Sequence, residues 1–123
     1  MPYIRLNATK KISGEQKKAL SNGLTEAVKL IPNKTVLILC IEDAKTIFIA
    51  NKEQEDHVFI EFDMCGDYDI EIRRKFAAAA FAAVTDVLGT TSDKIGLRIT
   101  QHGSWGGFGD FIEVDKDGNV ISR

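Results

Sequence analysis

A chain of 123 residues with 44% hydrophobic side chains is the size of one compact domain, and we predict that residues 1–123 form one. The formal charge of −2 comes from Lys and Arg interspersed with Asp and Glu, without the basic face that nucleic-acid binding requires. No apolar run approaches the roughly 20 residues of a membrane span, and no charged leader precedes an apolar stretch. We therefore expect a cytoplasmic protein that binds neither nucleic acid nor membrane.

The first half of the chain has the pattern strand, helix, strand. Ser13 and Gln16 form the capping-box pattern that begins a helix, and apolar residues then recur at helical spacing. The predicted elements are a strand at 2–7, a helix at 14–31, a strand at 35–41 that is buried on both faces of a parallel sheet, and a short strand at 46–50 before a polar loop at 51–56.

The second half repeats this plan. Asp69 is a good N-cap for a long alanine-rich helix, and Gly89 is the type of residue that ends one. Beyond residue 101 the sequence is rich in glycine around Trp105 and Phe108, and we expect an irregular loop at 103–110. The predicted elements are a strand at 57–64, a turn at 65–69, a helix ending near 88–89 and a strand at 95–101.

The two helices begin about 56 residues apart, so the chain consists of two copies of one β-α-β unit, with pseudo-repeats at about 2–50 and 57–111. An Asp-Gly turn predicts a C-terminal hairpin at 109–122. Right-handed crossovers place both helices on one face of a shared sheet. The predicted fold class is α/β (α+β): two tandem units in one mixed sheet. Apolar strands and unpaired edges favour an oligomer that extends the sheets.

Pro2, directly behind the initiator methionine, has two interpretations. It could simply begin an edge strand, where the missing N–H costs nothing. Alternatively, removal of Met1 would leave the Pro2 nitrogen as a free secondary amine. The dipeptide alone leaves both interpretations open.

The proline, the first strand, the helix that opens Ser13-Gly14-Glu15-Gln16-Lys17 and the duplicated unit together resemble the tautomerase superfamily. The helix start is similar to that of 4-oxalocrotonate tautomerase subunits. A single chain with both units resembles macrophage migration inhibitory factor and the phenylpyruvate tautomerases, over about residues 2–111. The resemblance implies a homotrimer without cofactor or metal. It also implies a keto-enol tautomerase, an isomerase of the intramolecular oxidoreductase class, acting on a small 2-keto acid with Pro2 as general acid/base.

This chemistry makes demands on the surroundings of Pro2. A neutral amine can take a proton from a carbon beside a carbonyl if its pKa lies near the working pH, and apolar surroundings lower the pKa of an amine. We expect Ile4, Met64, Trp105 and Phe108 to supply that apolar wall, and the last three of them to contact the substrate. The alternative for Trp105 and Phe108 is packing in the core or at an interface.

A keto acid also needs a cation for its carboxylate. Arg98 is the preferred candidate because the family commonly presents a polar site residue on this strand; the alternative is a surface arginine. Lys29 is a second candidate. Lys29 and Lys34 flank the position of the lysine that many relatives carry after the first helix, and neither fills it. The tyrosine of the migration inhibitory factor branch falls on Gly96, so substrate specificity stays open.

Other pairs of side chains carry weaker signals. His57 and His102 have no metal-ligand spacing, and either could pair with Cys65 as a nucleophile. Glu61 and Asp63 alternate on one strand, as an acid/base pair or as a solvated face.

Two rival functions also remain. One is a non-catalytic trimer that binds a protein partner and uses its proline only to start a strand. The other is a dehalogenase- or decarboxylase-type relative that uses a protonated proline.

Overall fold

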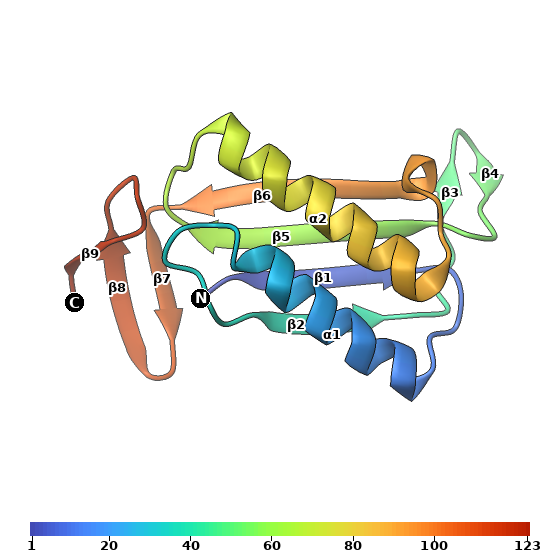
Figure 1. The fold of residues 1–123 in the computed structure, drawn as a ribbon, viewed down its shortest axis with the longest axis horizontal. Helices are drawn as coiled ribbons and strands as arrows, with labels where there is room; N and C mark the ends of the chain where they lie inside the picture. The colour runs from blue at the N-terminus through green and yellow to red at the C-terminus, as the bar shows by residue number, and fades with distance from the viewer.

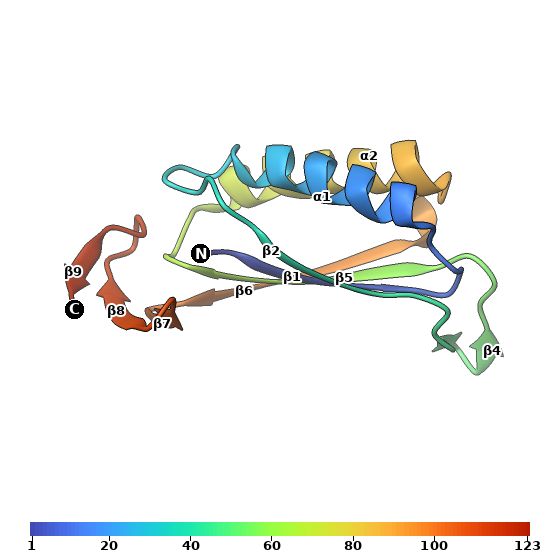
Figure 2. The ribbon, with the colours of Figure 1, turned by 90° about the horizontal axis from the view of Figure 1, so that it is seen from below.

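A computed structural model describes residues 1–123. A four-stranded sheet forms the centre, both helices cover one of its faces, and smaller sheets extend from its two ends (Figures 1 and 2). Neither helix is long and apolar enough to cross a membrane. In chain order the elements are β1 (Tyr3–Ala8), α1 (Gly14–Val28), β2 (Ile38–Glu42), β3 (Phe48–Ile49), β4 (Lys52–Glu53), β5 (Val58–Cys65), α2 (Ile70–Leu88), a 3₁₀ turn (Ser92–Lys94), β6 (Ile95–His102), β7 (Ser104–Gly107), β8 (Asp110–Val114) and β9 (Val120–Ser122).

The central sheet confirms the predicted fold class. Its strand order is β2-β1-β5-β6, with β1 parallel to β2, β5 parallel to β6, and β1 antiparallel to β5. Each half of the chain is thus a β-α-β unit, and the two units join edge to edge through β1 and β5. Figure 2 shows α1 and α2 side by side on the same face.

Local sequence sets the helix ends. The Ser13 hydroxyl accepts from the Gln16 amide while the Gln16 side chain accepts from the Ser13 amide, which completes the capping box. Helix α1 ends at Val28, three residues before the predicted end, because Ile31 N–H donates to the Val28 carbonyl in a tighter 3₁₀-type turn. Asp69 caps α2 through the Ile72 amide, and Gly89 ends it in the left-handed conformation.

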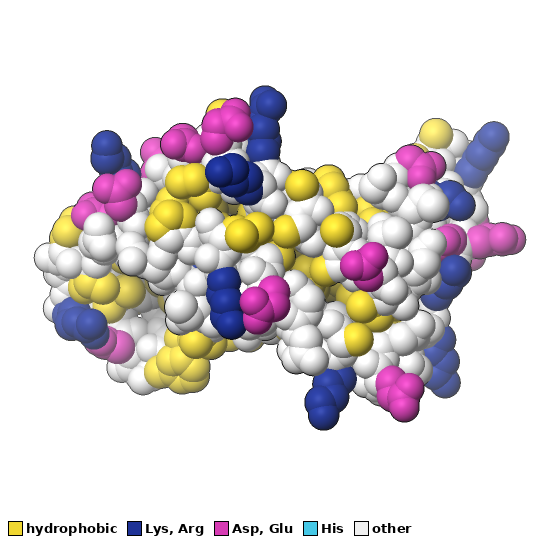
Figure 3. Space-filling view, viewed as in Figure 1, with side chains coloured by type: hydrophobic (Ala, Val, Ile, Leu, Met, Phe, Trp, Pro, Cys, Tyr) yellow, Lys and Arg dark blue, Asp and Glu magenta, His cyan; other side chains and the backbone are white.

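The hydrophobic core lies between the helices and the sheet. Alternate residues of β1 and β5 point into it, among them Leu6, Ile60 and Phe62, each 1% exposed or less. The Phe62 ring stacks on that of Phe76 from α2, with centroids 4.3 Å apart. The other residues of these strands lie on the opposite face of the sheet, which neither helix covers (Figure 2). On the helical face, charges of both signs are interspersed (Figure 3).

The prediction for 35–41 was wrong in two respects. Strand β2 begins at Ile38 rather than Thr35, and it is an edge strand of the central sheet. Leu39 and Ile41 pack against the core, whereas Ile38 is 40% exposed. The continuous apolar run at 35–41 therefore forms a strand with only one face packed on the core; its other face is open in the single chain.

Two predicted loops contain short strands. The segment 51–56 includes β4, which pairs with β3 in place of the longer strand predicted at 46–50. The glycine-rich segment 103–110 includes β7, which pairs with β8. Both strands lie outside the core, so the hydrophobic alternation that predicts a strand is absent from them.

Candidate functional site

A cavity of about 190 Å³ lies where the chain begins. Its walls come from Met1 and Pro2, the loop 33–36 between α1 and β2, Cys65 at the end of β5, and the C-terminal strands and turn. Figure 1 shows the N-terminus beside β5 and facing the β7–β9 sheet. Four segments far apart in sequence thus enclose one small space.

Pro2 is buried at the entrance to β1, and its carbonyl accepts from the Ile38 amide at 3.0 Å. The terminal amine belongs here to Met1. Burial, and secondarily the positive charge of Lys34, lower the pKa of this amine below its ordinary value. The start of the chain therefore lies where a protonated amine is disfavoured.

Lys34 is the cation of this cavity. It is only 6% exposed and forms no ion pair with a carboxylate, and burial lowers its pKa. Lys34 Nζ lies over the Tyr68 ring, 5.8 Å from its centroid, where a cation–π contact can stabilise the charge. A lysine with so little exposure and no carboxylate partner is uncommon because desolvating the charge is costly. Its ammonium is not fully cut off from solvent, so it is a candidate for binding an anion at this cavity.

A tight turn places Lys34. Asn33 adopts a left-handed conformation with φ of 68°, and the Lys34 amide donates to the Ile31 carbonyl at 3.1 Å. Sequence reasoning noted Lys34 but chose Lys29 as the second carboxylate candidate. Lys29 is exposed at the C-cap of α1 and pairs with Glu26 at 3.0 Å, away from the cavity. The Pro-Asn turn just before Lys34 marks a change of chain direction, but no residue near it indicates that this lysine is buried.

Cys65 places a thiol in the same cavity. It is 1% exposed, and burial raises its pKa, which keeps it protonated at neutral pH. His102 bonds to Asp63 rather than to this thiol, with 2.8 Å between His102 Nε2 and Asp63 Oδ1. Cys65 and His102 therefore do not form the nucleophile pair that the sequence suggested.

Most of the other predicted site residues lie elsewhere in the chain. Arg98 is on the open face of the sheet, 59% exposed, and donates to Glu61 at 2.6 Å. Met64 is fully buried in the core, as is Ile4. Phe108 is 85% exposed in the turn after β7. Of the predicted set, Pro2 alone lines the cavity within one chain.

Trp105 lies next to the cavity, on the far side of Met1. A Cβ atom built on Gly107 would be 3.3 Å from Met1 Cε and 3.7 Å from the indole of Trp105. The Met1 side chain therefore reaches toward β7. The indole also meets the His102 ring edge-on, with centroids 5.7 Å apart.

Glu61 and Asp63 do not form an acid/base pair with each other. Glu61 accepts from Asn7 at 3.0 Å and from Arg98, and Asp63 bonds to His102. These pairs cover the open face of the sheet with polar side chains and place no shared proton between the two carboxylates.

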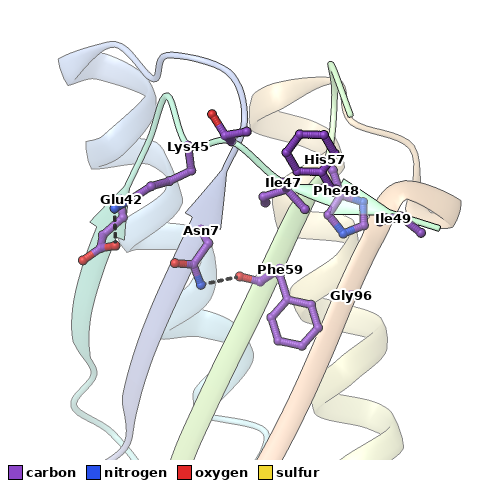
Figure 4. A pocket seen from close by; sticks show the side chains of 10 residues that line it. Asn7, Glu42, Lys45, Ile47, Phe48, Ile49, His57, Phe59 and Gly96 are labelled. Carbon is purple, nitrogen blue, oxygen red and sulfur yellow. Dashed lines mark hydrogen bonds and ion pairs between the residues drawn. The ribbon is translucent and has the colours of Figure 1, made fainter. Parts of the chain in front are cut away.

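A larger cavity, of about 600 Å³, lies at the other end of the sheet (Figure 4). The segment 45–49, which includes β3, and the open sheet face line it, and Phe48, His57 and Phe59 are among its lining residues. Its cation, Lys45, pairs with Glu42 at 3.0 Å. Sequence reasoning did not foresee this cavity because it takes 46–56 to fold back over the sheet.

No protein-family model matches the chain, and no curated protein matches its sequence. Solved structures do match its fold. MIF2 of Leishmania major superposes with a TM-score of 0.82 at 14% identity, over 90% of this chain and 97% of that one. Pt0534 inactivated by 2-oxo-3-pentynoate matches with a TM-score of 0.76 at 18% identity, over 87% and 92%. A fused 4-OT symmetric trimer matches with a TM-score of 0.71 at 17% identity, over 81% and 85%.

These identities are too low to carry residue roles, but the coverage is nearly complete on both sides. The predicted resemblance is confirmed at the level of the whole fold: this chain has the fold of the tautomerase superfamily.

Proposed function

We propose that this protein is a cofactor-independent tautomerase that moves a proton between carbon and oxygen of a small 2-oxo acid, with the Pro2 nitrogen as general acid/base after removal of Met1. The observation that carries the proposal is the cavity itself: a buried lysine without a carboxylate partner lies in one small space with the start of the chain. Such a lysine suits a substrate carboxylate.

The reaction follows from these two groups. The substrate carboxylate binds the Lys34 ammonium, which fixes the neighbouring carbonyl toward the chain start. The neutral Pro2 nitrogen takes a proton from the carbon beside that carbonyl, and the electron pair moves to the carbonyl oxygen. The same nitrogen then returns the proton to oxygen; ketonisation is the reverse. Burial and the charge of Lys34 lower the pKa of the Met1 amine. We expect the same surroundings to favour a neutral amine on Pro2 once Met1 is removed.

Removal of Met1 would also enlarge the cavity. The Met1 side chain lies between Pro2 and β7, so its loss would open the space toward Gly107 and Trp105. The indole would then form an apolar wall for the substrate, the role we predicted from sequence. A retained methionine would instead block both the amine and this space.

We also propose that the protein is a homotrimer. The 4-OT structure of the same fold is described as a symmetric trimer, and β2 and β6 both present unpaired edges here. In such an assembly Arg98, which lies outside the cavity of its own chain, could act as a second carboxylate anchor for a neighbouring copy.

The test is the rate of ketonisation of phenylenolpyruvate and of 2-hydroxymuconate, followed by ultraviolet absorbance. Wild type should turn over at least one of them, and Pro2→Ala should lower kcat about a hundredfold to ten-thousandfold, the usual contribution of a general acid/base. Intact mass should show a chain without Met1. Lys29→Ala is the matched control, with unchanged turnover.

Equal rates for wild type and Pro2→Ala would exclude the proline as acid/base. No turnover of either substrate by wild type would favour the partner-binding or dehalogenase-type alternatives.

A further inference from the structure

The C-terminal turn covers the lysine of the cavity and is tied down by one tyrosine. The Tyr68 hydroxyl lies 2.9 Å from the Pro32 carbonyl and 2.8 Å from the Asp117 carbonyl. The first carbonyl precedes the turn that carries Lys34, and the second belongs to the turn between β8 and β9. Tyr68 is 4% exposed, so its single hydroxyl proton is shared between two carbonyls away from water.

Two glycines make room for this tyrosine. Gly66 has φ of 113°, and a Cβ there would lie 2.7 Å from the Tyr68 ring. Gly118 has φ of 80°; a Cβ there would overlap the Tyr68 hydroxyl and lie 3.3 Å from Lys34 Nζ. Neither position suits another residue, because the left-handed conformation and the contact both exclude a side chain.

Hydrogen bonds within the chain hold the turn that carries Gly118 in one conformation. The Asp115 carboxylate accepts from the amides of Asp117 and Asn119, both at 2.9 Å, and the Asp67 amide donates to the Lys116 carbonyl. The carboxylate of Asp115 is thereby occupied by backbone N–H groups and is not used to neutralise Lys34.

We infer that Tyr68 is a positioning residue for the carboxylate site: with the turn 115–119 it keeps the Lys34 ammonium buried, unpaired and directed at the cavity. A lysine side chain left uncovered would extend its ammonium into water. The other titratable groups at the cavity are the terminal amine and the Cys65 thiol, which is uncharged at neutral pH. Asp115 and Asp117 lie nearer the tyrosine. This inference rests on the proposed function and explains why the C-terminal hairpin folds back toward the chain start.

The test compares Tyr68→Phe with wild type in the binding of pyruvate, measured by calorimetry between pH 7 and 11. Loss of the hydroxyl should weaken pyruvate binding about threefold to tenfold, the range expected for one hydrogen bond. The alkaline midpoint of binding should move upward, because Lys34 gains water. Tyr3→Phe, which removes the other tyrosine hydroxyl of the chain, should leave both quantities unchanged.

A second variant, Asp115→Ala, loosens the turn without touching the tyrosine and should shift both quantities in the same direction. Thermal unfolding of each variant checks that it is folded. Pyruvate affinity within twofold of wild type and an unmoved midpoint in Tyr68→Phe would overturn the inference, as would a wild type that does not bind pyruvate.

Pyruvate binding needs no turnover, so it separates this inference from the proposed function. Normal pyruvate binding together with a fully active Pro2→Ala would refute the acid/base proposal alone.

Discussion

The two ends of the central sheet each hold a cavity with a lysine in it, and the two lysines are in opposite electrostatic states. Lys45, at the larger cavity, is half exposed and paired with Glu42 at 3.0 Å. Lys34, at the smaller one, is buried and has no carboxylate partner. The larger cavity has about three times the volume, 600 Å³ against 190 Å³.

The proposed function assigns the site to the smaller cavity, so it rests on the electrostatic state of the lysine and not on cavity volume. A lysine paired at the surface contributes little and needs no ligand. A buried lysine without a partner costs stability, and a fold retains such a cost where binding or catalysis uses it. The two ends of the sheet should therefore respond differently to matched substitutions.

Among the substitutions that compare the two ends of the sheet, the largest expected effect is on anion affinity. Lys34→Met removes a charge-assisted contact worth about 1.5–3 kcal/mol, so pyruvate affinity and kcat/KM should fall about tenfold to hundredfold. Lys45→Met, the matched change at the other cavity, should alter neither by more than about twofold because its charge is already paired. Equal losses of pyruvate affinity in Lys34→Met and Lys45→Met would show that the two cavities do not differ in anion binding.

The larger cavity should respond in stability rather than in binding. A Cβ added to Gly96 would lie 2.5 Å from the Phe59 ring, which lines this cavity with it. Gly96→Ala should therefore lower the free energy of unfolding by about 1–3 kcal/mol, the usual cost of overpacking. Chemical denaturation measures the change, and pyruvate affinity should be unaffected. Weaker pyruvate binding by the folded variant would argue against this separation.

A smaller effect concerns pH. Burial lowers the pKa of Lys34 below its value in the unfolded chain. At a pH between the folded and the unfolded pKa of Lys34, the unfolded chain binds more protons than the folded chain. The free energy of unfolding therefore rises with pH across this range. Lys34→Met should remove this contribution and stabilise the protein at neutral pH by about 1 kcal/mol. Chemical denaturation of wild type and Lys34→Met at pH 7 and above measures this difference in the free energy of unfolding. The same pH dependence in both proteins would show that burying the Lys34 charge does not destabilise the fold.

The smallest effect should come from the lysine that sequence reasoning preferred. Lys29 is exposed and pairs with Glu26 one turn away, so Lys29→Ala should change stability by less than about 0.5 kcal/mol. Pyruvate affinity should match wild type. A loss comparable to that of Lys34→Met would restore Lys29 as the anchor.

Local patterns predicted most of the fold. The capping box at Ser13, the N-cap at Asp69 and Gly89 each act within a few residues, so their effects do not depend on the rest of the chain. The strand β7 was missed because its glycines carry no hydrophobic alternation. The open face of β2 could not be foreseen from its own residues, since it depends on the edge position of the strand.

The site was harder to predict than the fold. Period-two alternation already places Met64 with Phe62 on the buried face and Arg98 with Glu61 on the open one, so these two assignments could have been corrected from sequence. The role of Lys34 could not have been predicted from sequence. Its burial depends on a turn some 80 residues further along the chain, which Tyr68 holds in place. Contacts between such distant segments leave no local signal.

The most direct test of the account is a titration of the folded protein with pyruvate, followed residue by residue in ¹H–¹⁵N NMR spectra. If the small cavity is the site, the amides of Lys34, Cys65 and Gly118 should shift with a common saturation curve, and those of Lys45, His57 and Gly96 should stay in place. The opposite pattern, with saturable shifts confined to the larger cavity, would contradict the central claim that the buried, unpaired lysine marks the functional end of the sheet.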